Sequence, residues 1–85
     1  MELTDNHYLS AVVTATEVVL EHRVRPEENF FDIGGDSVSA LELVAVLESE
    51  LRITIPLQDV FHSTSLTDIA ARLSARTPGR GSTVK

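Results

Sequence analysis

A serine hydroxyl stands where an apolar loop meets an apolar helical pattern, in the stretch FFDIGGDSVSALELV. Ser37 follows Gly34, Gly35 and Asp36 directly. A serine in such a place can act as a nucleophile, receive a group from another enzyme, or cap a helix. A nucleophile needs a nearby base and a group to orient that base, whereas a modified serine needs only exposure and a surface that the modifying enzyme can bind. The neighbours of Ser37 therefore decide which chemistry it performs.

The sequence shows no group that would activate Ser37. The candidate bases His7, His22 and His62 are each predicted at the surface or at a helix end. GGDSV lacks the G-x-S-x-G pattern of a nucleophile elbow, and it lacks the G-K-[ST] ending of a phosphate-binding loop. The histidines and carboxylates have no metal-ligand spacing, and there is no cysteine for a thiolate or a disulfide. We expect a chain without enzymatic activity or a bound metal.

Length and composition limit the class of protein. The chain has 85 residues, which suits one small domain, and 42% of them are hydrophobic, enough for a modest core. No apolar run approaches the length of a membrane span, and MELTDNHYL lacks the pattern of a signal peptide. We therefore expect a cytoplasmic protein that does not bind membranes.

Acidic residues are concentrated around Ser37. The formal net charge is -6, and the segment from Pro26 to Leu51 contains no lysine or arginine. Phosphates would be repelled there, so the charge argues against nucleic acid as a partner. It favours a protein partner with a basic surface, although a plain solvated face would look the same. The acids are Glu27, Glu28, Asp32, Asp36, Glu42, Glu48 and Glu50.

Hydrophobic periodicity predicts a first helix over residues 5–22, with its apolar stripe at Leu9, Val12, Val13, Thr16, Val19 and Leu20. Pro26 ends that pattern, and a long loop follows to Gly35. The loop is too apolar for a free linker, so it is expected to fold back onto the core. Its predicted anchors are Phe30, Phe31 and Ile33.

Three further helices follow. The second begins at Asp36 or Ser37 and ends at Leu51, after which RITIP runs extended with Ile53 and Ile55 facing inward. PLQDVF predicts a short third helix with Pro56 in its first turn. Ser65 and Asp68 form a capping pair for a fourth helix, whose stripe is Leu66, Ile69, Ala70 and Leu73. The fold class is therefore an all-α, small four-helix bundle with a long first loop and a short third helix.

The second helix carries more apolar surface than a core requires. At about 100° per residue, one arc holds a complete core-facing stripe. Val38, Leu41 and Ala45 fall on another face beside Ser37, flanked by Glu42, Glu48 and Ser49. An exposed apolar patch with a polar rim is typical of a protein-binding surface, unless the third helix covers it. The core-facing stripe is Ala40, Leu43, Val44, Leu47 and Leu51.

These residues resemble those of carrier proteins. FFDIGGDSVSALELVAVLESEL is similar to their phosphopantetheine attachment region, in which an acid, a glycine and Asp or His precede the serine of an apolar helix. IPLQDVFHSTSLTDIAARL resembles the later half of the family, a Pro-led short helix ending in Phe and then a Ser/Thr-capped last helix. The paired glycines look most like the peptidyl carrier proteins, or thiolation domains, of nonribosomal peptide synthetases.

The resemblance implies a bundle of the acyl-carrier-protein type over residues 1–75. RTPGRGSTVK is basic and rich in Gly, Pro, Ser and Thr, so residues 76–85 are expected to form a flexible tail or linker. It implies that a phosphopantetheinyl transferase, using coenzyme A and a divalent metal, attaches 4'-phosphopantetheine to Ser37. The thiol of that group would carry an aminoacyl or peptidyl cargo as a thioester. Gly34, Gly35 and Asp36 match the attachment loop. The residues implied in partner docking are Val38, Leu41, Glu42, Ala45 and Phe61.

The implied partners are an adenylation enzyme or domain that loads the cargo, and condensation, tailoring or thioesterase domains that receive it. The carrier itself would be a non-catalytic monomer. Asp36 also matches acyl and aryl carriers, so an acyl or aryl carrier of a polyketide, siderophore or fatty-acid pathway stays open. Two further hypotheses are a helical interaction module in which Ser37 is only a helix cap, and a small hydrolase that uses Ser37.

Overall fold

The computed structural model describes residues 5–76, and within that range it contains helices and no strand. The elements are α1 (Asp5–Leu20), the 3₁₀ helix η1 (Phe30–Ile33), α2 (Ser37–Leu51), α3 (Leu57–Phe61) and α4 (Leu66–Arg76). The all-α bundle with a long first loop and a short third helix is confirmed. None of the described helices is long and apolar enough to cross a membrane.

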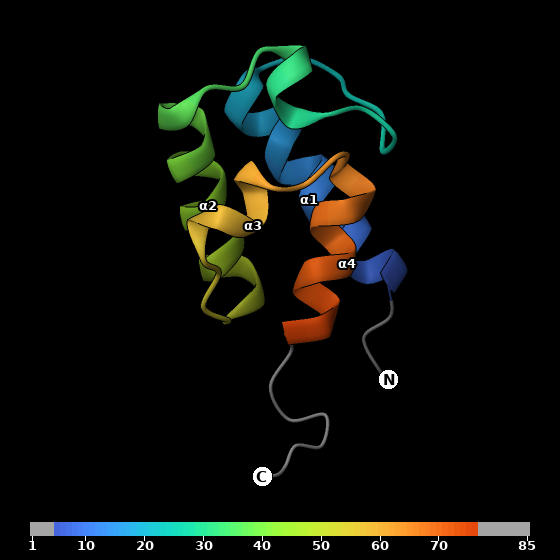
Figure 1. The fold of residues 1–85 in the computed structure, drawn as a ribbon, viewed down its shortest axis with the longest axis vertical. Helices are drawn as coiled ribbons and strands as arrows, with labels where there is room; N and C mark the ends of the chain where they lie inside the picture. The colour runs from blue at the N-terminus through green and yellow to red at the C-terminus, as the bar shows by residue number, and fades with distance from the viewer. Residues whose placement is uncertain (1–4, 77–85) are drawn as a thin grey trace, which may run out of the picture.

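The helices surround a single core, and the long first loop closes one end of the bundle. α1 packs against both α2 and α4, and the short α3 bridges α2 and α4. In Figure 1 the loop with η1 lies at the top of the molecule, next to the start of α2. The end of α4 and the start of α1 lie away from that loop. The stretch from Gly34 to Ser37 is therefore presented at one end of the bundle.

The core is formed by one face of each long helix. On α1, Val12 and Thr16 are buried as predicted, while Tyr8 and Ala15 are buried although they lie outside the predicted stripe. The Thr16 hydroxyl donates to the carbonyl of Val12 at 2.7 Å, so this buried polar group is satisfied. Leu51 of α2 is only partly buried, against the edge of the core. The remaining α2 and α4 stripes are confirmed as buried: Ala40, Leu43, Val44, Leu47, Leu66, Ile69, Ala70 and Leu73.

The first helix is shorter than predicted. It ends at Leu20 rather than His22, because Glu21 adopts the left-handed conformation with φ of 63°. Two contacts hold the chain after this turn: the Glu21 N–H donates to the carbonyl of Glu17 at 2.8 Å, and the Val24 N–H donates to the Glu17 carboxylate at 3.1 Å. Val24 is buried, so the turn brings the loop back to the core at once.

The first loop is anchored as expected by its apolar side chains. Phe30 is buried, and Phe31 and Ile33 pack partly buried against the core. The extended segment before α3 behaves similarly, with Ile55 buried and Ile53 partly buried. The sequence pattern therefore places both irregular segments correctly relative to the core.

Two helix starts differ in detail from the prediction. Pro56 is the N-cap of α3 and not a residue of its first turn. At α4, Ser65 Oγ accepts from the Asp68 N–H at 3.0 Å, and the Asp68 carboxylate accepts from the Thr64 N–H at 3.0 Å. The carboxylate thus reaches the residue before the cap, where a standard capping box would bond the cap itself.

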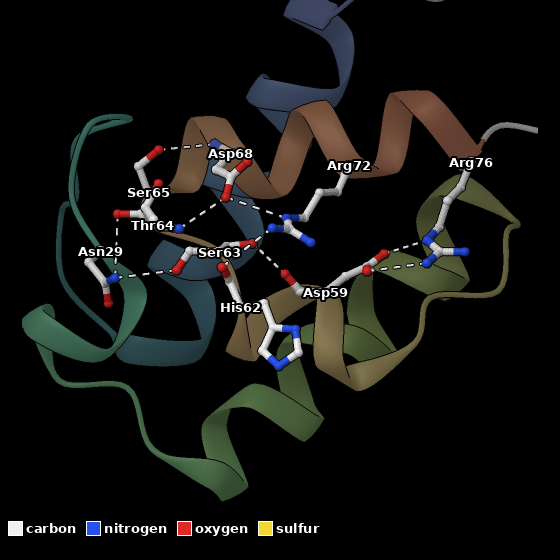
Figure 2. Close-up of polar contacts among 9 residues, drawn as sticks. All are labelled: Asn29, Asp59, His62, Ser63, Thr64, Ser65, Asp68, Arg72 and Arg76. Carbon is white, nitrogen blue, oxygen red and sulfur yellow. Dashed lines mark hydrogen bonds and ion pairs between the residues drawn. The ribbon is translucent and has the colours of Figure 1, made fainter.

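The first loop is fastened to the start of α4 by hydrogen bonds between distant parts of the sequence. The Leu66 N–H donates to the carbonyl of Glu28 at 2.9 Å, and the Thr67 N–H to that of Pro26 at 3.0 Å. Figure 2 shows the Asn29 amide reaching the carbonyls of Ser63 and Thr64, at 3.4 Å each. The bonds from Leu66 and Thr67 occupy N–H groups that a helix start leaves without intrahelical partners, so the loop completes the start of α4.

A salt bridge joins α3 to the last residue of α4. Arg76 Nε donates to Asp59 Oδ2 at 2.5 Å, and Arg76 Nη2 to Asp59 Oδ1 at 3.3 Å (Figure 2). Asp59 is buried, and its carboxylate raises the pKa of Arg76 mainly through this hydrogen bond. Arg76 therefore belongs to the folded domain and not to the tail predicted to begin there. The rest of that tail, residues 77–85, lies outside the described residues.

Candidate functional site

The loop before Ser37 needs glycine at two positions for two different reasons. Gly34 ends η1 in the left-handed region, with φ of 113°, where glycine has no steric penalty. At Gly35 a Cβ would collide with the Phe30 ring and would lie 2.7 Å from the Phe30 carbonyl oxygen. The Gly35 N–H also donates to that oxygen, at 3.0 Å. The paired glycines thus let the chain turn closely around Phe30 before it enters α2.

Asp36 caps α2. Its backbone is extended, and its carboxylate accepts from the Ser39 N–H at 2.8 Å. Hydrogen bonding to the Ser39 backbone, and then to its side chain, lowers the pKa of Asp36 below the ordinary 3.8. A carboxylate at a helix start also interacts favourably with the helix dipole. Asp36 therefore performs the structural task at this helix start.

Ser37 is the first helical residue of α2 and is exposed. Within residues 5–76 its hydroxyl has no hydrogen-bond partner. The hypothesis that Ser37 is only a helix cap is wrong, because Asp36 occupies the cap position and supplies the capping oxygen. The hydroxyl has no structural duty, and it is open to a reagent that arrives from solvent.

No described histidine forms a hydrogen bond with Ser37. His7, His22 and His62 are all exposed, as the sequence predicts. Both ring nitrogens of His22 are engaged with backbone carbonyls, those of Arg23 and Ile33, each at 2.9 Å. Residues 5–76 also contain no group of three or more histidine and carboxylate side chains arranged to hold a metal ion.

The second face of α2 is open to solvent. Val38 is 65% exposed and Leu41 is 56% exposed, and Glu42 and Ala45 are exposed as well. The alternative in which α3 covers this patch is therefore wrong. The structure places these four side chains on the helix that begins at Ser37. They form an apolar patch with an acidic neighbour, next to the free hydroxyl.

Phe61, the last residue of α3, is 41% exposed. Its ring stacks on that of Phe31 in η1, with centroids 5.3 Å apart and planes 7° from parallel. Phe31 in turn meets Phe30 edge to face. Phe61 is thus an exposed aromatic with a fixed ring orientation, held by the loop that leads to Ser37.

The acidic segment divides into structural and exposed carboxylates. Glu28 accepts from the Arg25 N–H at 2.7 Å, and Glu48 from the Ile55 N–H at 2.8 Å. Together with the Asp36 cap, these acids hold backbone turns. Glu48, predicted to flank the apolar patch, is therefore occupied in holding the turn after α2. The acids that remain exposed without such a bond are Glu27, Asp32, Glu42 and Glu50.

The comparison with protein families gives a match over most of the chain. The family model described as "Phosphopantetheine attachment site" matches residues 9–73. That range covers the glycine turn, Ser37, the exposed face of α2 and Phe61, the same features that the structure gathers at one end of the bundle. The proteins of this family bind 4'-phosphopantetheine covalently.

Curated relatives are far larger proteins. Nonribosomal peptide synthetase 6 of Cochliobolus heterostrophus is 44% identical over 55 residues, which are 64% of this chain and 3% of that protein. Bacitracin synthase 2 of Bacillus licheniformis is 27% identical over 60 residues, 71% of this chain and 2% of that protein. The hybrid PKS-NRPS synthetase prlS of a fungus is 37% identical over 65 residues, 73% of this chain and 2% of that protein. This chain thus spans a few hundredths of the length of the relatives it matches, and by its match over residues 9–73 it belongs to the phosphopantetheine attachment-site family of carrier domains.

Proposed function

We propose that this domain carries aminoacyl or peptidyl groups in nonribosomal peptide synthesis, as thioesters on a 4'-phosphopantetheine joined to Ser37. The observation that carries the proposal is the exposed Ser37 hydroxyl, which has no partner among the described residues while Asp36 caps the helix. An amino acid or peptide is favoured over an acyl cargo because the relative from Cochliobolus heterostrophus is named as a nonribosomal peptide synthetase alone.

The surroundings of Ser37 are compatible with an attached 4'-phosphopantetheine. A primary hydroxyl in solvent can form a phosphodiester, and a phosphate on it would lie at the positive end of the α2 dipole. When bound, 4'-phosphopantetheine supplies the thiol that this cysteine-free chain lacks. The task of the domain is then to present Ser37 and to be recognised, which agrees with a rigid glycine turn and an exposed apolar face.

The modifying enzyme must provide the base. Ser37 Oγ attacks the phosphorus of coenzyme A that bears the phosphopantetheine arm, the phosphoanhydride bond breaks, and the nucleotide part leaves. The hydroxyl proton goes to the phosphopantetheinyl transferase, because no described histidine bonds Ser37. The same division of labour means that this chain contributes no catalytic residue of its own.

The face formed by Val38, Leu41, Glu42 and Ala45, with Phe61 at the end of α3, serves in this proposal as the docking surface. Its partners would be the phosphopantetheinyl transferase, an adenylation enzyme or domain, and condensation, tailoring or thioesterase domains. The apolar side chains offer area for burial, and Glu42 offers a contact for a basic residue on the partner. Nearness to Ser37 lets a docked enzyme reach the hydroxyl.

Mass spectrometry after incubation with coenzyme A, a divalent metal and a broad-specificity phosphopantetheinyl transferase tests the proposal. We expect a gain of one phosphopantetheinyl group, and no gain in Ser37→Ala. Ser10→Ala is the matched control, because Ser10 is an exposed serine on α1 rather than α2. An unmodified wild-type chain, or modification that persists in Ser37→Ala, would overturn the assignment.

A further inference from the structure

His22 bridges two backbone carbonyls at the foot of the attachment loop. Its Nδ1 lies 2.9 Å from the carbonyl oxygen of Arg23, and its Nε2 lies 2.9 Å from that of Ile33, eleven residues further on. Ile33 is the last residue of η1, directly before Gly34. The ring also stands beside the turn itself, because a Cβ at Gly34 would lie 3.8 Å from His22 Nε2.

The bridge sets the protonation state of the ring. A carbonyl oxygen only accepts hydrogen bonds, so each ring nitrogen must donate to keep both contacts. A neutral imidazole has one N–H, and only the imidazolium has two. Loss of the proton therefore breaks either the bond to Arg23 or the bond to Ile33.

The surroundings favour the charged ring. The hydrogen bond to Arg23 and then that to Ile33 raise the pKa of His22 above its ordinary 6.5. Desolvation opposes them, and the Glu28 and Glu17 carboxylates add smaller raising effects. Because the folded-state pKa is raised, the bridge is complete at low pH and is lost as the pH rises through that pKa. The titratable or charged side chains on the adjoining segments are Glu17, Glu21, Arg23, Arg25, Glu27, Glu28, Asp32 and Asp36.

On the side of η1, the N–H groups of both Gly34 and Gly35 donate to the Phe30 carbonyl oxygen and hold the turn. His22 holds the other side, from the end of α1. We propose that His22 is a positioning residue for the attachment site: its imidazolium form holds the Ile33 carbonyl, and through it the Gly34–Gly35 turn, in the orientation that presents Ser37 to partner enzymes.

The structural half of this proposal is tested by NMR on the unmodified protein. The amide signal of Gly34, which shares a peptide group with the Ile33 carbonyl, should titrate with the same midpoint as the His22 ring. In His22→Gln that titration of Gly34 should vanish, whereas in His7→Gln it should persist. His7 lies in the first turn of α1. The start of α1 lies away from the loop that contains η1 (Figure 1). A Gly34 signal that ignores the His22 titration, or that titrates equally in His22→Gln, would overturn the proposal.

The second part of the proposal, that His22 helps to present Ser37 to partner enzymes, rests on the proposed function. It is tested by the rate at which one phosphopantetheinyl transferase modifies wild type, divided by its rate on His22→Gln. Taking ratios cancels the pH dependence of the transferase. Below the His22 pKa, wild type should be modified up to about fivefold faster than His22→Gln, which is the equivalent of one hydrogen bond. The ratio should fall as the pH rises through that pKa, because the neutral ring can keep only one of the two bonds, and His7→Gln should match wild type throughout.

The two failures are distinguishable. If wild-type protein is not modified at any pH, the proposed function fails, while the NMR titration still decides whether His22 holds the loop. If wild type is modified but His22→Gln has the same rate at every pH, the positioning role of His22 is refuted and the attachment site stands.

Discussion

Replacing Leu41 by aspartate should impair partner enzymes and leave the fold intact. Leu41 is 56% exposed on α2, so the substitution removes little buried area and opens no cavity. The main cost within the domain is the poorer helix propensity of aspartate, about 0.5 kcal/mol. The free energy of unfolding should therefore fall by no more than about 1 kcal/mol.

The effect on docking should be larger. Burying a whole leucine side chain is worth about 1.5–3 kcal/mol, and roughly half of that remains available at Leu41 for a partner to gain. Losing about 0.8–1.5 kcal/mol corresponds to a factor of about 4–13 in kcat/KM for the partner enzyme. A carboxylate forced into an apolar contact adds a desolvation cost, so we expect a loss of about tenfold or more.

The assay measures the rate of modification by a phosphopantetheinyl transferase and, separately, urea unfolding. Val18→Asp is the matched control, because Val18 is an exposed β-branched residue, 65% exposed, on α1 rather than α2. Leu41→Asp should slow modification while Val18→Asp should not. Equal rates for the two variants would remove Leu41 from the docking surface, and unfolding of Leu41→Asp would show that the side chain supports the core.

Three further substitutions probe the core, the turn and the cap. Leu47→Ala removes a side chain with 0% exposure and should cost about 2–5 kcal/mol in urea unfolding, and a smaller loss than about 1 kcal/mol would mean that the site collapses around the deletion. Gly35→Ala forces a Cβ against Phe30 and should cost about 1–3 kcal/mol, so an unchanged midpoint would refute the close packing of this turn. Asp36→Asn keeps a capping oxygen but loses the charge. Because the Asp36 pKa is lowered by folding, its charge stabilises the domain above pH 3.8, and the advantage of wild type over Asp36→Asn should disappear as the pH falls through the folded-state pKa. A difference independent of pH would contradict this, as measured by unfolding from pH 7 to pH 2.

Hydrophobic spacing predicts the parts of this fold that depend on long, repeated patterns. The α2 and α4 stripes were predictable because Leu43, Leu47, Ile69 and Leu73 recur every three or four residues and are all buried. The exposed position of Leu41 was predictable from the same helical spacing, because another face of α2 already carries a complete core-facing stripe. The free hydroxyl of Ser37 also follows from local sequence, because a preceding aspartate is a strong cap.

Features that depend on backbone conformation or on distant contacts could not be predicted from the sequence pattern. Glu21 ends α1 in the left-handed conformation, which glycine or asparagine usually adopts at a helix end. A glutamate at this position therefore does not predict that the helix ends there. The partners of His22 are carbonyls of Arg23 and Ile33, which every residue type possesses, so no side-chain pattern announces the bridge. Asp59 is buried and pairs with Arg76, seventeen residues further on, and no local pattern predicts a contact at that separation.

Tyr8 shows a different limit. The first helix contains apolar or small residues on several neighbouring faces, so two stripes that differ by a small rotation fit its pattern almost equally well. Packing against α2 and α4 selects the one that includes Tyr8 and Ala15. Only the tertiary contacts of α1 could make that choice.

The hydrogen bonds between residues 26–29 and residues 63–67 limit how such a domain can be shortened or recombined. Without the α4 segment, the carbonyls of Pro26 and Glu28 would lose their donors, and the Asn29 amide would lose both acceptors. A fragment cut before Ser63 would therefore present its serine from an unsupported loop, even though every residue of the GGDS stretch were retained. A splice junction should therefore lie beyond Arg76, so that the salt bridge between Arg76 and Asp59 is kept.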